Sequence, residues 1–434
     1  AWLEKAASDE VKEQLKANTE AAVKRGVFGA EKTCLIADGR VTLASFLRDQ
    51  GYHTAMVGKW HLGMDFPGTK GKRDWSQPVL DMPLDKGFDY FWGIPASMNY
   101  GVLAWFEGRH AAVPPTLWTK KKRNKIALSD YRIAPPYEKT QQPDLMEVAP
   151  DFVDSECLTR FTDQAIEWIE GVAEEARQGT PFFLYLPHTM PHWPQYSSER
   201  FAGKSANGKW GDAAEEIDWS TGEILKALKA NGLDEKTMVI FMSDNGGPTR
   251  HGASNKPLKG GKGSTWEGGH RVPFVVRWPG VIPAGTSSDA MATSMDLLPT
   301  LAKFAGAKPP TDRKLDGKDI APLLLAKPGA ATPHKAFYFY SRGQLHAVRS
   351  GDWKLFFTRG KQAPKGRPAA LYNLASDIGE ASNVLGDHPG VAKRLAKLAE
   401  GMRADIGDDL TGAKGSGTRE PGFVKNARTL TKRK

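Results

Sequence analysis

Lys59 and His61 stand two residues apart at the end of a short apolar run in the segment Gly51–Gly63. The run is typical of a strand, and Val41–Gln50 before it has the pattern of a helix that stops at Gly51. An ammonium group and an imidazole at the end of one strand can both reach the same anion. Most Lys-x-His triplets are solvated surface residues, so this pair alone favours a site only weakly.

Two more candidate sites contain polar residues beside glycines. Asp244 and Asn245 come just after the apolar run Thr237–Met242, and a carboxylate oxygen with an amide oxygen suits a hard divalent cation. An Asp-Asn-Gly sequence at a strand end is just as often only a turn. Lys262 stands in the stretch Gly260–Gly263, which would let an ammonium group approach an oxyanion closely, although flexible surface loops have the same composition.

Two histidines and a serine complete the candidates. His188 and His192 follow the apolar run Phe182–Leu186, and ligands of open parallel sheets bind outside the carboxyl ends of the strands. A lone histidine is nevertheless more often structural than catalytic. Ser97 closes the segment Gly87–Ser97 and, taken alone, is interpreted as a turn serine.

The segment Gly51–Gly63 closely resembles the second signature of the sulfatase family, whose members hydrolyse sulfate esters within the alkaline-phosphatase-like superfamily. Further stretches resemble landmarks of this family in the same order along the chain. They are Gly87–Ser97, Pro181–Pro194, Val239–Gly247 and Lys259–Pro273, followed by Ser294–Thr300, Leu315–Gly317, Val348–Lys354 and Leu371–Asn383. The resemblance spans nearly all of Val41–Asn383.

The resemblance implies a role for each candidate. It implies four catalytic side chains around the sulfate ester, namely Lys59, His61, His192 and Lys262. It also implies that Ser97 contacts the substrate and that Asp244 and Asn245 bind a divalent cation, most often calcium. Such a set would surround the ester, and the leaving oxygen on which charge develops, with positive charge and hydrogen-bond donors.

The family's nucleophile is a formylglycine made from the cysteine, or sometimes serine, of Cys-x-Pro-x-Arg, and a strand ending in paired metal-binding aspartates precedes it. Neither pattern occurs here: Cys34 lies in Cys-Leu-Ile-Ala-Asp-Gly-Arg, and Cys157 has the pattern of a core cysteine in a helix. The chain starts at Ala1 rather than at a methionine. We therefore expect a sulfatase that lacks its first strand and nucleophile segment, with the formylglycine upstream and these residues inactive by themselves.

Charge and composition bear on partners. The net charge of +10 points to an acidic substrate or partner, and basic clusters at Lys120–Lys125 and Lys432–Lys434 are either solvated segments or contacts for a sulfated polyanion. No nucleic-acid recognition motif accompanies them, so we expect no nucleic-acid partner. No apolar run reaches the length of about 18 residues that a membrane span needs. The family resemblance implies a periplasmic or secreted location, and the sequence leaves the oligomeric state open.

Helical patterns alternate with apolar runs, which predicts an α/β fold with a mostly parallel sheet sandwiched by helices, as in alkaline-phosphatase-like proteins. The predicted helices are Asp154–Gln178, Ala213–Asn231 and Met295–Phe304, and the predicted strands are Phe182–Leu186, Thr237–Met242 and a buried Val272–Trp278. Residues 1–330 would form this catalytic domain, which ends near a Pro/Ala-rich linker at Pro328–Pro333.

After the linker, the strand-like runs are short and closely spaced, at Ala336–Tyr340, Leu345–Ser350 and Trp353–Thr358. This spacing predicts a small C-terminal α+β domain over residues 331–411, with an antiparallel sheet covered by the helix His388–Arg403. A mobile basic tail would follow over residues 412–434.

Three functions are compatible with these residues: an active sulfatase, a non-catalytic sulfate-ester-binding protein, and a related phosphatase or phosphonate hydrolase. The sequence retains six of the implied site residues, which argues against the second: Lys59, His61, His192, Asp244, Asn245 and Lys262. The Lys-x-His and Gly-Lys-Gly patterns argue against the third. The segment Asn99–Met146 combines cations with Tyr100, Trp105, Phe106 and Trp118. Because aromatic faces suit sugar rings, we predict a sulfated carbohydrate rather than a small aryl sulfate, unless these aromatics only pin a long loop to the core.

Overall fold

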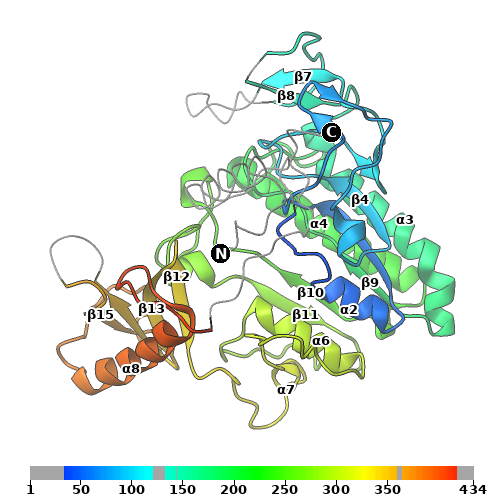
Figure 1. Cartoon of the computed structure of the whole chain (residues 1–434). Helices are drawn as coiled ribbons and strands as arrows, with labels where there is room; N and C mark the ends of the chain where they lie inside the picture. The colour runs from blue at the N-terminus through cyan, green and yellow to red at the C-terminus, as the bar shows by residue number, and fades with distance from the viewer. Residues whose placement is uncertain (1–33, 121–131, 143, 359–363, 418–434) are drawn as a thin grey trace. The chain divides into compact units, whose positions relative to one another are not determined.

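The structure is a computed structural model that describes residues 34–120, 132–142, 144–358 and 364–417 (Figure 1). The described residues fall into two compact units, one ending at Asp234 and the other beginning at Glu235. The predicted domain boundary near residue 330 stays a prediction. Within the described ranges, no helix combines the length and the apolar character needed to cross a membrane.

The first unit is built on a five-stranded sheet with β1 in its interior and the order β6-β5-β4-β1-β9. β1 pairs in parallel with β4 and β9, whereas β5 and β6 extend the sheet in antiparallel fashion. The strands are β1 (His53–Lys59), β4 (Tyr90–Ile94), β5 (Phe106–Glu107), β6 (His110–Ala111) and β9 (Phe182–Tyr185). The predicted strands before Lys59 and after Thr180 are thus confirmed.

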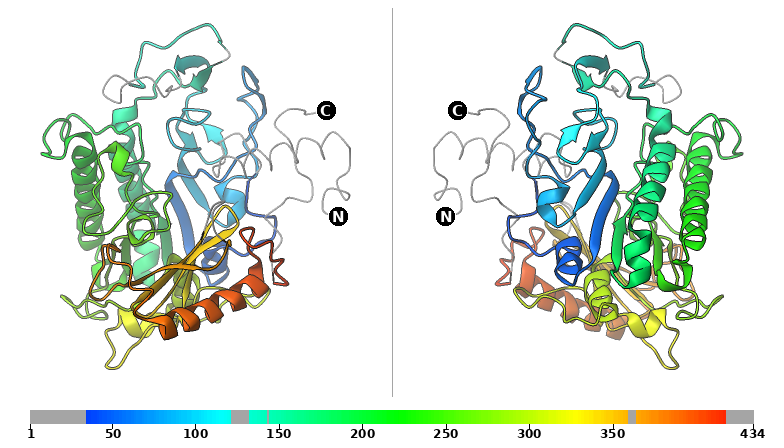
Figure 2. Two further views of the ribbon diagram at one scale, coloured as in Figure 1. Left: turned by 90° about the vertical axis from the view of Figure 1, so that its left-hand side faces the viewer. Right: turned by 90° about the vertical axis from the view of Figure 1, so that its right-hand side faces the viewer.

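Helix α2 (Leu43–Asp49) leads into β1. Thr42 and Ser45 form a capping box at its start, and Gly51 adopts a left-handed φ of 85° after its end, so the helix and its predicted stop are confirmed. The long helix α3 (Cys157–Gln178) packs against the sheet, and α4 (Gly208–Ala230) lies side by side with α3 (Figure 2). Both match the predicted helical segments. The unit also contains the short helices η2 (Pro83–Lys86) and η4 (Asp154–Glu156). It contains two small antiparallel pairs, β2 (Gly68–Thr69) with β3 (Lys72–Arg73) and β7 (Leu117–Lys120) with β8 (Leu145–Val148).

The loop after β9 places His188 against these helices. Its Nε2 lies 3.3 Å from Ser220 Oγ on α4, and its ring centroid lies 6.4 Å from that of Phe161 on α3. Nδ1 is shielded from solvent and has no hydrogen-bond partner among the described residues. Burial lowers the pKa of His188 from 6.5 to about 4, because the charged imidazolium would lose its hydration. His188 is therefore a structural, neutral histidine.

This burial predicts a pH dependence of stability. Between pH 6.5 and 4 the unfolded chain binds a proton at His188 that the folded chain does not, so the free energy of unfolding should fall as the pH falls below 6.5, by up to about 3 kcal/mol. Urea unfolding of the protein and of His188→Gln at pH 7, 5.5 and 4.5 measures the effect. In the variant, the free energy of unfolding should depend less steeply on pH over this range. His53→Gln, at a histidine exposed beside Glu175, is the control. Equal slopes for the protein and His188→Gln would contradict the prediction.

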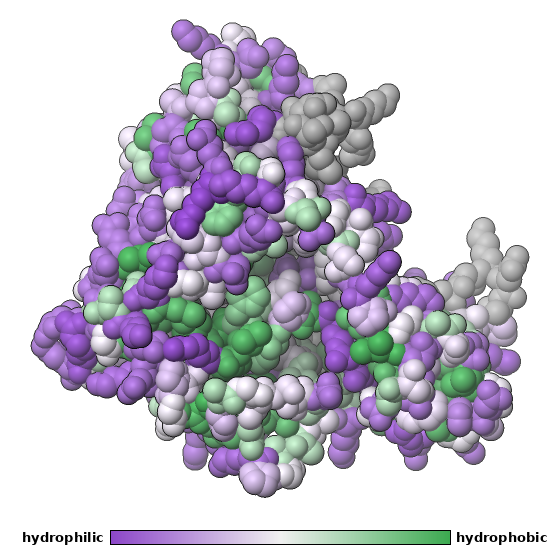
Figure 3. All heavy atoms as spheres, turned by 180° about the vertical axis from the view of Figure 1, so that it is seen from behind, coloured by the Kyte–Doolittle hydropathy of each residue, from purple (hydrophilic) through white to green (hydrophobic). Residues whose placement is uncertain are grey.

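The second unit begins with η5 (Asp234–Lys236) and the strands β10 (Val239–Met242) and β11 (Phe274–Arg277), which pair in antiparallel fashion. The sequence pattern predicts a buried strand over Val272–Trp278, and this is wrong in one respect. The strand exists, but Phe274 is 37% and Val275 60% exposed, because the described residues give β11 only one neighbouring strand. Apolar side chains do reach the molecular surface as green patches in Figure 3.

Helical elements follow both strands of this pair. They are η6 (Thr249–His251), α5 (Glu267–His270), η7 (Ser294–Asp296), α6 (Leu297–Phe304) and α7 (Ala321–Leu324). The segment formed by η7 and α6 confirms the helix predicted over Met295–Phe304. Thr293 and Asp296 form a capping box at its start.

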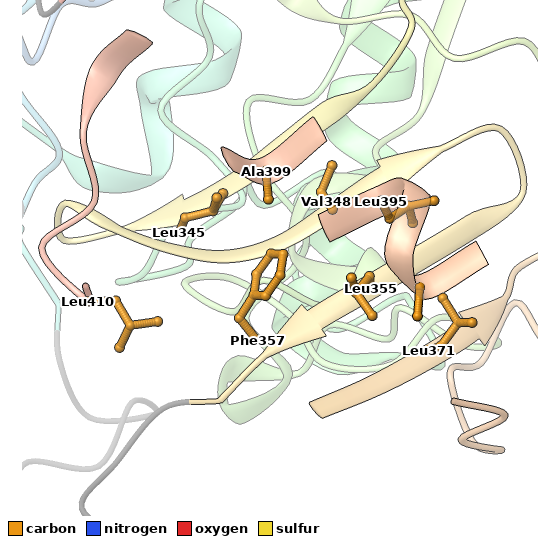
Figure 4. Close-up of a cluster of buried hydrophobic side chains, with 9 residues drawn as sticks. Leu345, Val348, Leu355, Phe357, Leu371, Leu395, Ala399 and Leu410 are labelled. Atoms are coloured by element: carbon orange, nitrogen blue, oxygen red, sulfur yellow. The ribbon is translucent and has the colours of Figure 1, made fainter. Parts of the chain in front are cut away.

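The end of the second unit is the predicted antiparallel sheet covered by one helix. The strands β12 (Phe337–Ser341), β13 (Gln344–Ser350), β14 (Trp353–Phe357) and β15 (Pro368–Asn373) pair in chain order, and α8 (Pro389–Ile406) contacts three of them. Figure 4 shows strand residues such as Leu355 and Phe357 facing Leu395 and Ala399 of the helix. Burial of these apolar side chains stabilises the sheet–helix pair. The predicted basic tail is described only as far as Gly417.

Candidate active site

The carboxyl ends of three adjacent parallel strands meet at one edge of the first unit's sheet. Lys59 is the last residue of β1, and its backbone N–H donates to Pro187 O, just after β9, at 2.9 Å. The next two N–H groups, of Trp60 and His61, donate to Ile94 O and Pro95 O at the end of β4, at 3.1 and 2.8 Å. Because the chain after β1 is held on both sides, Lys59 and His61 have fixed backbone positions between the other two loops.

Glycine makes this close approach feasible. Gly58 has a φ of 138°, and a Cβ placed on it would lie 2.3 Å from Pro187 O. Its partner across the β1–β4 pair, Gly93, would place a Cβ 1.9 Å from Gly58 O. A side chain at either position would push the strands apart, so the two glycines set the spacing on both sides of Lys59.

His61 contacts two residues of the loop after β4. Its Nδ1 lies 3.3 Å from Ser97 Oγ, and its ring centroid lies 4.8 Å from that of Tyr100. The backbone of His61 is left-handed, with a φ of 59°, a conformation that is strained for a non-glycine residue and often marks functional sites. The structure thus brings together His61 and Ser97, and it adds Tyr100 as a direct neighbour of the imidazole.

Asn99 is a residue that the sequence patterns miss. It lies in the turn closed by the hydrogen bond from Tyr100 N to Ser97 O at 2.8 Å, is 5% exposed, and its Oδ1 has no hydrogen-bond partner among the described residues. A buried amide oxygen without a donor is costly. In the sequence, only its position two residues after Ser97 indicates that Asn99 lies near the candidate site. Its burial distinguishes it from an ordinary turn asparagine.

His192 follows β9 in the loop that also contains Pro187. Its Nδ1 lies 2.7 Å from Trp193 O, and the two rings are stacked with centroids 6.1 Å apart. Since a carbonyl oxygen can only accept, Nδ1 carries the proton, and the orientation of the ring is fixed by this bond. His192 therefore lies in the loop after β9, the strand that neighbours β1.

Asp244 and Asn245 follow β10 in the second unit, as predicted. Asn245 Nδ2 donates to Gly246 O at 3.1 Å, which leaves the amide oxygen on the opposite side of the group, and Ser243 Oγ donates to Asn245 O at 2.9 Å. Asp244 is exposed. The pair thus offers one charged and one neutral oxygen, a donor set that fits part of a calcium shell of about 6–8 oxygens. No group of three or more His, Cys, Asp or Glu that could hold a metal occurs within the described ranges.

Lys262 lies against the same turn. Its backbone N–H donates to Gly247 O at 3.3 Å, and Gly246 N donates to Gly269 O at 3.1 Å. Asn255 ties the two segments further, because its Nδ2 donates to Gly247 O at 2.8 Å and to Gly260 O at 3.1 Å. The structure therefore unites Lys262 with the metal-ligand candidates within the second unit, and leaves its side chain exposed. Convergence of this group with Lys59, His61, Ser97 and His192 stays a prediction.

Neither cysteine offers a reactive thiolate. Cys34 is 2% exposed and burial raises its pKa to about 12, while Cys157, 1% exposed in α3, has its pKa raised well above 9 by burial. Cys157 packs its Sγ 3.7 Å from Met98 Sδ. The interpretation of Cys157 as a core cysteine is confirmed.

Comparisons with known proteins agree with these features. The model of the sulfatase family matches residues 17–307, and a model described as "N-sulphoglucosamine sulphohydrolase, C-terminal" matches residues 261–405. Steryl-sulfatase of Homo sapiens is 34% identical over 377 residues, which cover 73% of this chain and 60% of that protein. N-acetylgalactosamine-6-sulfatase of Canis lupus familiaris is 34% identical over 328 residues, which cover 74% of this chain and 55% of that protein. The chain thus spans less than two thirds of the length of either relative.

A solved structure from Bacteroides thetaiotaomicron, described under the metabolism of multiple glycosaminoglycans, matches with a TM-score of 0.70 and 26% identity over 87% of this chain and 85% of that chain. This likeness, with the largely parallel sheet of the first unit and the antiparallel C-terminal sheet, confirms the predicted alkaline-phosphatase-like α/β fold. The sulfatase match covers well over half of the residues, in the order in which the signatures occur. The chain therefore belongs to the sulfatase family.

Proposed function

We propose that this protein hydrolyses sulfate esters of carbohydrates, and that Lys59, His61, His192 and Lys262 contact the ester sulfate. The observation that carries the proposal is the arrangement of Lys59, His61 and Ser97 at the ends of adjacent parallel strands, with Ser97 Oγ 3.3 Å from His61 Nδ1. Clefts at the carboxyl ends of parallel strands are where α/β proteins bind their ligands. Membership of the sulfatase family gives that edge its chemistry.

Each side chain has a distinct task in this proposal. The ammonium groups of Lys59 and Lys262 balance the charge of the sulfate and of the leaving oxygen as the ester bond breaks. An N–H group of His61 donates to a sulfate oxygen, and Ser97 orients His61. His192, whose Nδ1–H donates to Trp193 O, donates to a sulfate oxygen from Nε2 when its ring is doubly protonated. Because such donors are held in place before the reaction, they stabilise developing charge without first having to reorganise.

Two further groups complete the proposed site. Asp244 and Asn245 would hold a divalent cation, most often calcium in this family, which would act as a Lewis acid on a sulfate oxygen. The family's nucleophile is a formylglycine, and the proposal assigns it to sequence upstream of Ala1, since neither Cys34 nor Cys157 lies in Cys-x-Pro-x-Arg. The buried state of both thiols is in keeping with this assignment.

The carbohydrate preference rests on relatives and on Tyr100. One relative is an N-acetylgalactosamine-6-sulfatase, and the solved structure is described under glycosaminoglycan metabolism. Tyr100 is half-buried beside His61, where its ring can contact a sugar. Three other aromatics of the segment lie in the core, since Trp105 is 1%, Phe106 0% and Trp118 7% exposed. They pin the segment and do not form a sugar platform. Of the basic cluster, Lys120 is exposed and Lys121–Lys125 lie outside the described residues.

The test compares turnover of sulfated oligosaccharides with that of a small aryl sulfate by the protein carrying the predicted nucleophile segment. We expect the higher kcat/KM on the oligosaccharides, and we expect it to fall between about 20 mM and 500 mM salt, since the attraction of a polyanion to a basic surface is screened. Chelation of divalent cations should abolish turnover, and added calcium should restore it.

Three outcomes would contradict this proposal. Turnover of the aryl ester alone, insensitive to salt, would exclude the polyanion substrate. Binding of sulfated oligosaccharides without release of sulfate would favour a non-catalytic binding protein. Faster hydrolysis of a phosphate or phosphonate ester would assign the site to the related hydrolases. The expected periplasmic or secreted location and the absence of a nucleic-acid partner stay predictions.

A further inference from the structure

The loop that carries Lys262 is tied to the C-terminal sheet by buried charges. Glu267, at the start of α5, is 2% exposed, and its two carboxylate oxygens each lie 2.9 Å from a cation. One cation is Arg349 on β13 and the other is Lys354 on β14. Glu267 thus fixes the start of α5, next to this loop, to two strands of the C-terminal sheet.

A second carboxylate shares the same lysine. Glu380, fully buried after β15, lies with Oε1 2.9 Å from Lys354 Nζ, while its Oε2 accepts a hydrogen bond from Glu267 N at 2.8 Å. Its carbonyl accepts from Lys259 Nζ at 2.9 Å, and that ammonium lies 4.0 Å from the centroid of the Trp266 ring. Both ends of the segment Lys259–Glu267 are therefore bound to one residue, Glu380.

Lys354 is the centre of this cluster. It is fully buried, its Nζ lies 4.0 Å from the ring centroid of Phe339, and no solvent can replace its two carboxylate partners. Burying three such charges is weak evidence for added stability, because an apolar set of similar volume often packs as well. The charges instead define the position of the loop, because each hydrogen bond fixes one atom of the loop relative to the sheet.

The fixed atoms lie close to Lys262 along the chain. Gly268 N donates to Lys259 O at 2.8 Å, which closes the loop, and Gly269 O accepts from Gly246 N at 3.1 Å, beside Asn245. Thr265 Oγ1 lies 3.4 Å from His346 Nδ1 on β13. The position of Lys262 relative to Asp244 and Asn245 thus follows from contacts that lead back to the C-terminal sheet.

We propose that Lys354, through Glu267 and Glu380, is a positioning residue that sets the place of Lys262 in the active site without touching substrate. The proposal rests on the proposed function only where it assigns Lys262 to the sulfate. It makes the C-terminal sheet part of the catalytic apparatus, because a residue on β14 governs a side chain 92 positions earlier in sequence.

Hydrogen exchange tests the loop directly, without any need for turnover. In Lys354→Met, the amides of Gly246 and Gly268 should exchange at least about tenfold faster than in the unsubstituted protein, because their partners would no longer be held. The matched control is Arg403→Met, which removes another buried cation, 2.8 Å from Asp408, on α8. It should lower the melting temperature but leave the loop amides protected.

Activity then separates positioning from general destabilisation. Lys354→Met should lower kcat about tenfold to a hundredfold with a smaller change in KM, and this loss should vanish when Lys262 is already alanine. Lys354→Arg should recover part of the rate. If Lys354→Met does not fold, Lys354→Met/Glu380→Gln removes one charge of each sign and serves in its place.

Unchanged hydrogen exchange of the loop amides in Lys354→Met and in Lys354→Met/Glu380→Gln would overturn the proposal. So would a loss of kcat in Lys354→Met that is the same whether residue 262 is lysine or alanine. A complete absence of turnover in the unsubstituted protein that carries the predicted nucleophile segment would instead overturn the proposed function. In that event the exchange experiment still decides whether Lys354 holds the loop.

Discussion

Lys262→Ala is expected to lower kcat for sulfate-ester hydrolysis by about 10²–10³-fold, the loss that follows removal of one preorganised donor from a site of developing charge. Lys262 is exposed and lies on a loop whose backbone is bonded to the turn containing Asn245 and Gly247. Steady-state kinetics with saturating substrate measures the effect. The melting temperature should change little, because the side chain is exposed.

The control is Lys256→Ala, at another exposed lysine of the same region, six residues earlier. Lys256→Ala lowers the net positive charge by the same amount as Lys262→Ala. It should therefore reproduce any loss of activity that comes only from weaker long-range attraction of an anionic substrate. We expect kcat to stay within about twofold in that variant. Equal losses in the two variants, or a normal rate in Lys262→Ala, would show that Lys262 does not contact the reacting group.

Trp105→Ala should have the largest effect on stability, a loss of about 3–5 kcal/mol in the free energy of unfolding. The indole is 1% exposed, with ring centroids of Trp92, Phe152 and Phe161 at 5.2, 4.8 and 6.1 Å. Removing it leaves a cavity where the segment after β4 packs on α3. Urea unfolding followed by circular dichroism measures the loss.

Trp210→Ala, at a half-buried tryptophan near the start of α4, is the matched control and should cost clearly less. Well below its unfolding transition, Trp105→Ala should retain its KM for a sulfated oligosaccharide, because the ring is not at the surface. A raised KM with an unchanged free energy of unfolding would instead place Trp105 in the substrate site.

The local sequence pattern was sufficient to predict the strands whose ends carry the candidate side chains. The apolar runs before Lys59, His188 and Asp244 are strands, and the helices around them begin and end close to the predicted residues. The glycine-rich stretch Gly260–Gly263 lies in a loop, as its composition predicts. These features depend on a few consecutive residues, so one sequence contains the information.

Features that depend on distant partners could not be predicted in this way. Glu267 and Lys354 are 87 residues apart, and nothing in either neighbourhood states that they form a buried ion pair. The exposure of Val275 depends on how many strands flank β11 rather than on its own apolar character. Trp105 and Phe106 resemble a sugar-binding platform in sequence, and only packing shows that they belong to the core.

Gly58, Gly93 and Pro187 touch where β4, β1 and β9 lie side by side, with backbone atoms alone filling the space. A Cβ at Gly93 would lie 1.9 Å from Gly58 O, and one at Gly58 would lie 2.3 Å from Pro187 O. Even a substitution by alanine at Gly58 or Gly93 would require a strand to move. Neither position can therefore be varied in small steps, by natural variation or by protein engineering. We therefore expect changes in substrate preference to arise beyond the strand ends, in turns such as the one containing Tyr100. The backbone position of Lys59 should stay the same through such changes.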